Sequence, residues 1–266
     1  MAKEIKREVV KASETKAEAE KAPKKKKVDT ETGEKEVVQA KPTGSAVLKR
    51  VFAVVFWLLA IAAEVAAIML LNGYLYIPYD LKTLLIIAIA LDLIFVIIGS
   101  QFWKKANHIN PPSEKNKVWF FLCSQMGLIV AVIAFCPLIV LLLKNKDKLD
   151  KKTKVIVTVI AAVALLVAGA CSIDYDPVSQ ESLAEAKSEV SELTDDGTVY
   201  WTRYGRSYHC DINCHTLARS STLYEGTIEE AFAARRNDPC DYCAGGREAK
   251  LAERTATDEP AAETAE

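Results

Sequence analysis

The chain has 266 residues, half of them apolar, and a net charge of −1, and its length suits one large domain or two small ones. The near-neutral total hides segregation: residues 1–50 carry 14 Lys/Arg against 9 Asp/Glu, residues 51–171 carry 11 against 6, and residues 172–266 carry 9 against 20. This segregation excludes a single domain of uniform composition and indicates three different pieces joined end to end.

The first piece, residues 1–47, is rich in Lys, Glu, Ala, Thr and Val and has no large apolar cluster to bury. Such a stretch cannot offset its ordering entropy, so we expect a disordered tail. Its run Lys24–Lys27 resembles a nuclear-localisation signal, but next to a membrane segment attraction to anionic headgroups explains it better. The first apolar stretch begins near residue 48, which predicts no cleavable signal peptide.

Residues 48–173 contain four apolar runs, at about 51–71, 84–103, 118–143 and 155–173. A hydrocarbon core about 30 Å thick requires about 20 helical residues, and only a helix satisfies its own backbone in lipid. The connections between the runs are short, which favours antiparallel neighbours. We therefore expect a mostly α-helical chain with a four-helix transmembrane bundle, a multi-pass protein of the plasma membrane.

The positive-inside rule places the N-terminal tail and the second loop in the cytoplasm. The third loop conflicts with this placement, because a third span would put it outside although it carries Lys144, Lys146, Lys148, Lys151, Lys152 and Lys154. Either this loop is a tolerated exception, with both termini inside, or residues 118–143 are re-entrant near Pro137 and the C-terminal piece lies outside. The unbroken apolar run favours the four-span alternative, with a cytoplasmic N-terminus.

Two acidic residues lie inside the apolar runs, Glu64 in the first and Asp92 in the second. In an antiparallel pair of helices they lie at similar depth, where an unpartnered carboxylate is costly. They form either a polar clamp between the helices or a proton or cation relay of a small transporter. No intramembrane Lys, Arg or His completes a relay, which favours the clamp.

Residues 176–195 carry the signs of an amphipathic linker helix. Asp176-Pro177 reads as an N-cap followed by proline at the first helical position. An apolar stripe follows at helical spacing, made of Leu183, Ala186, Val190 and Leu193. This stripe either packs on the segment that follows or pairs with a second copy of the chain in a homo-oligomer.

Residues 198–246 have the pattern of a small α+β module. Residues 199–204 and 207–209 read as two short strands around the turn at Gly205. Thr227 with Glu230 forms a capping box that opens a short helix. Residues 247–266 are acidic, and we expect them to form a second disordered tail.

Four of the seven cysteines fall within this module, and their spacing is typical of a metal site. Cys240 and Cys243 form a C-x-x-C knuckle, and Cys214 supplies a third sulfur. The fourth ligand is His209 or Cys210, at H-x4-C or C-x3-C spacing. Zinc prefers four such soft or borderline ligands in a tetrahedron, often supplied as two pairs on separate turns. The alternative is one or two disulfides.

The module resembles the metal-binding domain of the bacterial Ada DNA-repair protein and the modules related to it. The resemblance covers residues 198–246 and rests on Val199-Tyr200-Trp201-Thr202, Gly205, Tyr208-His209, Cys214, Glu230-Ala231 and Pro239-Cys240-Asp241-Tyr242-Cys243. It implies that Zn2+ is bound by His209, Cys214, Cys240 and Cys243; Cys210 departs from the histidine form of the family and matches its four-cysteine form. The membrane part resembles uncharacterised bacterial membrane proteins, which adds no function.

The sequence has no paired exposed carboxylates, no nucleophile with an adjacent base and no phosphate-binding glycine loop, so we assign no catalytic residues. We expect a non-enzymatic protein that presents a zinc module to a macromolecular partner. Alternatives are the Glu64/Asp92 relay, a membrane-tethered thiol-redox protein, and a DNA-alkyl acceptor. Over residues 200–247 six Arg balance six acidic residues, which argues against a nucleic-acid partner.

Overall fold

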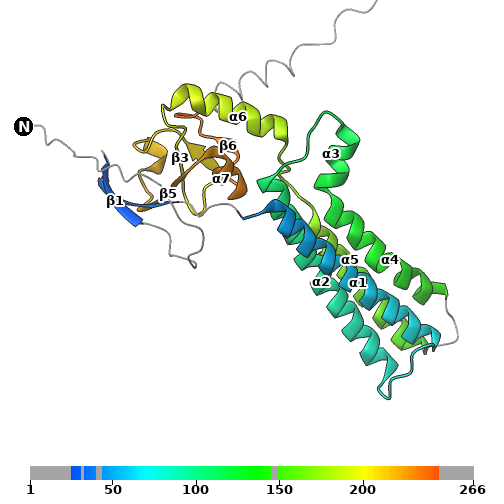
Figure 1. Cartoon of the computed structure of the whole chain (residues 1–266). Coiled ribbons are helices and arrows are strands. Elements are labelled where there is room, and N and C mark those ends of the chain that lie inside the picture. Colours follow the sequence, from blue (N-terminus) through cyan, green and yellow to red (C-terminus); the bar gives the residue numbers. More distant parts are fainter. Residues whose placement is uncertain (1–24, 31–32, 40–43, 145–148, 246–266) are drawn as a thin grey trace, which may run out of the picture.

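The structure is a computed structural model of the chain and describes residues 25–30, 33–39, 44–144 and 149–245. A bundle of long helices carries a smaller α+β module at one end (Figure 1). The helices of the bundle part are α1 (Ala46–Asn72), α2 (Leu81–Ile109), α3 (Lys117–Ser124), α4 (Met126–Lys144) and α5 (Lys151–Ser172).

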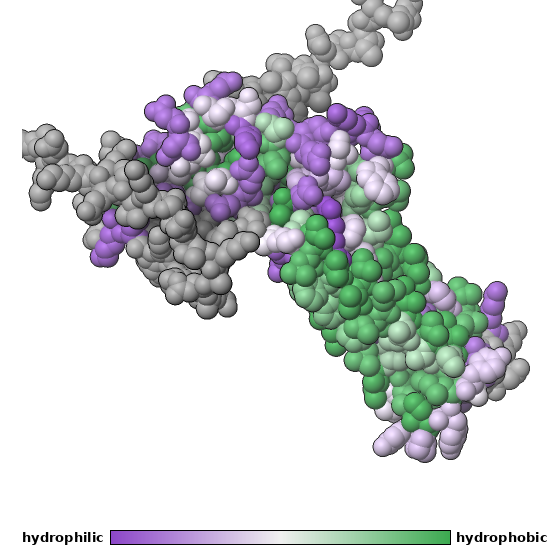
Figure 2. Space-filling model, viewed as in Figure 1, coloured by the Kyte–Doolittle hydropathy of each residue, from purple (hydrophilic) through white to green (hydrophobic). Residues whose placement is uncertain are grey.

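Four of these helices, α1, α2, α4 and α5, are long and apolar enough to cross a membrane, with mean hydropathy between 2.6 and 3.0. On the face shown in Figure 2, the surface of the bundle is a continuous apolar band, while polar residues gather on the module. Large apolar side chains on this band are exposed, Leu58 by 60% and Leu166 by 72%. Lipid suits such a surface, and the expectation of four helices able to cross a membrane is confirmed.

Small residues allow α1 and α2 to pack closely. Ala53, Ala60 and Ala67 recur every seven residues on α1, and each is at most 1% exposed. On α2, Gly99 faces Trp57: a Cβ at residue 99 would lie 2.6 Å from the indole ring. In lipid, where apolar burial gives no advantage, such close contact is what holds helices together.

The third apolar run was expected to form one helix over residues 118–143, and that expectation is wrong in one respect. The helix breaks between α3 and α4, at Gln125. The carbonyl of Cys123 at the break accepts hydrogen bonds from Trp103 Nε1 (2.8 Å) and Asn107 Nδ2 (3.0 Å). The break is stable because side chains of α2 satisfy this backbone group.

Pro137 lies inside α4 and does not end it, so α4 is continuous from Met126 to Lys144 and no re-entrant turn occurs there. The start of α1, the connection between α2 and α3, and the end of α5 all lie at the module end of the bundle (Figure 1). The chain therefore enters and leaves the bundle at the same end.

The N-terminal tail contains structure that we did not expect. Strands β1 (Lys25–Thr30) and β2 (Gly33–Gln39) pair antiparallel, and β2 pairs parallel with strand β5 (Thr222–Gly226) of the module. An edge strand has a row of unpaired backbone groups, and a tail strand can satisfy them without an apolar core of its own. The remaining expectations of disorder, for residues 1–24 and 247–266, fall outside the described residues.

The module contains a mixed sheet flanked by two helices. Its further elements are α6 (Gln180–Leu193), β3 (Val199–Trp201), β4 (Ser207–His209), a 3-10 turn (His215–Leu217), α7 (Ile228–Ala233) and β6 (Asp238–Pro239). The strand order is β1-β2-β5-β3-β4-β6. The strand predicted over residues 207–209 and the Thr227/Glu230 capping box are confirmed, whereas the strand predicted over 199–204 ends already at Trp201.

Helix α6 begins later than predicted. Its N-cap is Ser179, which forms a reciprocal capping box with Ser182, whereas Asp176 accepts a hydrogen bond from Asn237 Nδ2 at 3.1 Å. Asp176 therefore binds Asn237 of the module and does not cap α6. Of the apolar stripe, Ala186 and Val190 are buried in the module core, so the stripe packs on the module.

Several contacts fix the module against the bundle. The backbone N–H of Gln180 donates to Pro112 O at 3.1 Å, and the carboxylate of Glu181 accepts from Ser113 Oγ and from the Glu114 backbone N–H. Within the bundle, at the same end, Lys104 of α2 donates to Cys171 O at 2.7 Å, at the carbonyl end of α5 where a cation is favourable. The module therefore lies directly on the ends of the membrane helices.

Candidate metal centre

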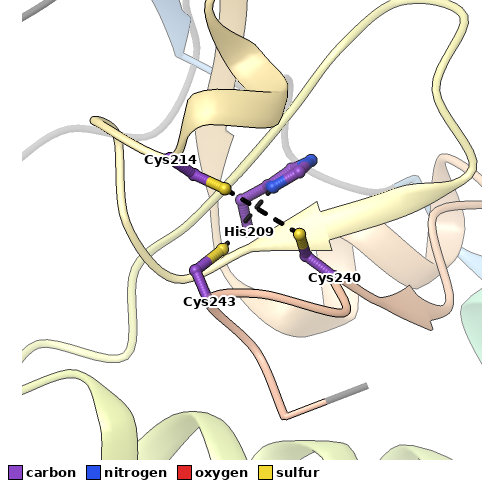
Figure 3. Close-up of side chains that lie close together, drawn as sticks. All are labelled: His209, Cys214, Cys240 and Cys243. Carbon is purple, nitrogen blue, oxygen red and sulfur yellow. Dashed lines mark hydrogen bonds between the residues drawn. The ribbon is translucent and has the colours of Figure 1, made fainter. Parts of the chain in front are cut away.

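Short elements from three parts of the module bring four potential ligands together (Figure 3). His209 ends strand β4, and Cys214 precedes the 3-10 turn. Cys240 follows β6, where its backbone N–H donates to Tyr208 O at 3.0 Å, and Cys243 lies on the tight turn that comes next. The sheet thus positions the knuckle beneath His209 and Cys214.

The four ligand atoms lie within 4.8 Å of one another. Cys214 Sγ is 3.9 Å from Cys240 Sγ, and Cys243 Sγ is 3.5 Å from His209 Nδ1. Around a tetrahedral zinc ion, metal–ligand bonds of about 2.3 Å to sulfur and 2.0–2.1 Å to nitrogen place two sulfurs about 3.8 Å apart and sulfur about 3.6 Å from nitrogen. These two distances match a tetrahedral metal ion, and the limit of 4.8 Å for the whole group leaves only a small contraction to complete the site.

The same distances argue against the disulfide alternative. The Cys214–Cys240 sulfur separation of 3.9 Å is nearly twice a disulfide bond of about 2.05 Å. All seven cysteines are free thiols in the structure. Three thiols and an imidazole gathered without a covalent link are the donor set of a metal site.

The surroundings favour the metal-binding forms of His209 and Cys240, whereas burial raises the pKa of Cys243 and favours its thiol form. Burial lowers the pKa of His209 to about 4, so its imidazole is neutral at pH 7 and has a lone pair for a metal. Burial by itself would raise the pKa of Cys240, but the backbone N–H groups of Tyr242 and Cys243, pointing at its sulfur, hold that pKa below the usual range. Cys240 is thus the thiol most ready to become a thiolate, the form that metals bind.

Cys210, the alternative fourth ligand, lies outside the cluster of four. His209 is the last residue of β4 and Cys210 lies at the bend that follows, and only the histidine belongs to the group of close ligand atoms. Burial, together with the nearby Cys240 and Glu189, raises the pKa of Cys210 to about 11, which keeps it protonated. The structure therefore places the histidine, not the cysteine, at the fourth position.

Thr216 is a member of the site that sequence reasoning missed. Its Oγ1 lies 3.1 Å from Cys214 Sγ, 3.4 Å from His209 Nδ1 and 3.7 Å from Cys240 Sγ. A hydroxyl in this position can donate a hydrogen bond to a thiolate and orient it, as partners behind metal ligands commonly do. Its only signal in the sequence is its position two residues after Cys214.

The intramembrane acids Glu64 and Asp92 are both buried in the bundle, 5% and 1% exposed. Glu64 of α1 accepts a hydrogen bond at 2.8 Å from the backbone N–H of Leu138 on α4, next to Pro137. Both oxygens of Asp92 are buried without a hydrogen-bond partner among the described residues. Glu64 therefore clamps α1 to α4, rather than to α2 as the sequence suggested, and Asp92 has no clamping partner.

Comparison with known protein families, with curated proteins and with solved structures finds no match for this chain. The resemblance to the Ada-type domain therefore stays a prediction based on residues 198–246.

Proposed function

We propose that this chain is an integral membrane protein whose metal ion has a structural role and holds together a module that binds a macromolecular partner. The observation that supports the proposal is the donor set: His209, Cys214, Cys240 and Cys243 lie close enough together to supply all four ligands of a tetrahedral site. A catalytic zinc site has three protein ligands and keeps one position open for water or substrate. A closed site supports a structural ion and a non-enzymatic role.

Zinc is the metal that this donor set suits best. Three sulfurs and one imidazole nitrogen at tetrahedral distances are typical of structural zinc, whereas oxygen-rich sites suit magnesium and calcium. The module spans about 50 residues, a size at which a single apolar core gives little stability and a metal commonly supplies the rest.

Two chemical alternatives are less well supported. An alkyl acceptor needs a thiolate that a DNA phosphate can reach, but Cys214 and Cys240 are only 5% and 4% exposed. A redox pair needs thiols free to exchange, whereas here Cys240 and Cys243 belong to the set that would hold the metal. The balance of basic and acidic residues over 200–247 again gives no basic surface for nucleic acid.

Cobalt substitution tests whether the site is closed. We expect full-length protein loaded with Co2+ to show the absorption of a tetrahedral thiolate complex that does not change when azide or imidazole is added. The physical reason is that no coordination position is vacant. A spectrum altered by these small ligands at stoichiometric metal would show an open position and contradict the structural role.

We also propose that the protein lies in the plasma membrane, with the start of α1 and the module both on the cytoplasmic side. The basic residues at this end, among them Lys49, Arg50 and Lys105, support it by the positive-inside rule. In intact cells, a cysteine introduced at exposed Tyr76 should react with a membrane-impermeant thiol reagent, and one at exposed Tyr204 should not. The reverse pattern would place the module outside.

A second function, proton or cation movement, is favoured by the unpartnered carboxylate of Asp92. If Asp92 is only structural, Asp92→Asn should raise the unfolding temperature of the purified protein by a few degrees, since the amide carries no charge to bury. Glu64→Gln serves as the matched control and should not stabilise, because Glu64 already accepts the Leu138 N–H. An ion flux in liposomes that Asp92→Asn abolishes would instead establish transport.

A further inference from the structure

A cleft of about 450 Å³ lies between the membrane helices and the metal module. One wall comes from the start of α1 and the end of α2, and the other from β3, β5 and α7. Lys49, on the bundle wall, lies near the start of α1, among the exposed apolar side chains of Val47, Leu48 and Val51. The cleft therefore lies at the level where lipid headgroups meet the hydrocarbon core.

The cleft is strongly basic. Lys49 and Lys105 line it from the bundle, and Arg203 and Arg236 line it from the module. The one acidic lining residue is Glu230, whose Oε2 accepts the Thr227 backbone N–H at 3.0 Å as part of the α7 cap. None of the four cations forms an ion pair with a carboxylate in the described part of the chain.

The two arginines are held in place by groups that do not neutralise them. Arg236 donates through Nε to Thr202 O at 3.2 Å and through Nη2 to Arg203 O. The guanidinium of Arg203 lies over the Tyr204 ring, 5.5 Å from its centroid. Carbonyls and aromatic faces orient a guanidinium while leaving its charge to attract an anion.

The module wall also contains an aromatic pair. Trp201 and Tyr224 stack with ring centroids 6.4 Å apart and an interplanar angle of 15°. Trp201 is only 4% exposed and belongs to the module core, so the half-buried Tyr224 is the ring of the pair that can meet lipid and water at the interface, where tyrosine is favoured. The cleft thus combines positive charge with the amphipathic lining that a lipid headgroup requires.

We propose that this cleft binds a phosphate group, presented by the headgroup of an anionic phospholipid from the adjoining leaflet. Its cations come from both the bundle and the module, so an anion bound there would join the two parts by interactions that neither could make alone. Lysine and arginine near a membrane surface are the residues that recognise anionic headgroups.

The test uses full-length, metal-loaded protein in detergent, titrated with phosphatidylglycerol, phosphatidylcholine or inorganic phosphate. Native mass spectrometry counts the bound molecules, and the rise of the unfolding temperature reports binding independently. The variant combines Lys105→Gln with Arg203→Gln, two exposed residues outside the metal cluster. The control combines Lys151→Gln with Lys152→Gln, two exposed cations at the opposite end of the bundle. Metal content of both variants confirms that the module is folded.

We expect saturable binding of phosphatidylglycerol over phosphatidylcholine, weakened at least about tenfold in the cleft variant and unchanged in the control. If inorganic phosphate binds but phosphatidylglycerol does not, and the cleft variant weakens this binding, the cleft is a phosphate site whose ligand is a soluble phosphate and not a lipid headgroup. Equal binding by wild type and cleft variant, or equal loss in the control, would overturn the proposal.

Discussion

Removing the metal ion is expected to unfold residues 199–244 while leaving the membrane helices intact. Structural zinc contributes about 10–16 kcal/mol of apparent binding free energy, more than the whole stability of most small domains. Hydrogen exchange should therefore become fast throughout β3, β4, β5 and α7 after treatment with a strong chelator, while α1, α2, α4 and α5 stay protected.

The double variant Cys240→Ser with Cys243→Ser should reproduce this loss of protection without chelator, because it removes half of the ligands. Cys210→Ser is the matched control: it removes a cysteine of the same module that lies outside the cluster, and it should retain metal and protection. Protection that survived both the chelator and the double variant would mean that the apolar core of the module is sufficient by itself.

A single methyl group at Gly127 is expected to disrupt the bundle. A Cβ there would lie 2.6 Å from Ser100 Oγ, 2.9 Å from Ser100 Cβ and 3.2 Å from Ser172 Cβ, where α2, α4 and α5 converge. It would also part the 2.9 Å hydrogen bond from Ser172 Oγ to Ser100 Oγ. Overpacking of this kind costs about 1–3 kcal/mol, so the unfolding temperature of Gly127→Ala should fall by several degrees.

Gly169 on α5 provides the comparison. A Cβ at this residue would meet Leu128 Cδ1 at 3.4 Å, an ordinary contact. Because alanine forms helices more readily than glycine, Gly169→Ala should be neutral or stabilising. Thermal unfolding of the two variants in the same detergent separates close packing from general helix propensity. Equal midpoints would contradict the close approach at Gly127.

The membrane helices could be predicted from sequence because each segment that crosses lipid must satisfy its own backbone hydrogen bonds, whatever the rest of the chain does. A run such as residues 51–71 must satisfy its own backbone and bury its own surface, so its length and apolarity are enough. The break at Gln125 could not be predicted, because it depends on Trp103 and Asn107, which are near it only in the folded bundle. The pairing of β2 with β5 likewise depends on an edge formed by residues distant in sequence.

In the candidate site, too, local sequence patterns could be predicted, whereas features that depend on the folded structure could not. The knuckle of Cys240 and Cys243, with Cys214 and His209, was predictable because few residue types bind zinc and their spacing is short. The choice between His209 and Cys210 was not, since it depends on which of two neighbours the end of β4 turns towards the knuckle. Thr216 escaped notice because threonine is common and only its contacts reveal its role.

X-ray absorption spectroscopy of the purified full-length protein shows whether one metal ion is held by three sulfurs and one nitrogen. We predict one zinc per chain, with three sulfur neighbours at about 2.3 Å and one nitrogen at about 2.0–2.1 Å. Replacing His209 with alanine should remove the nitrogen shell, and replacing Cys210 with serine should change nothing. A shell of four sulfurs, or protein that purifies without metal and with Cys240 and Cys243 oxidised, would exclude this metal site.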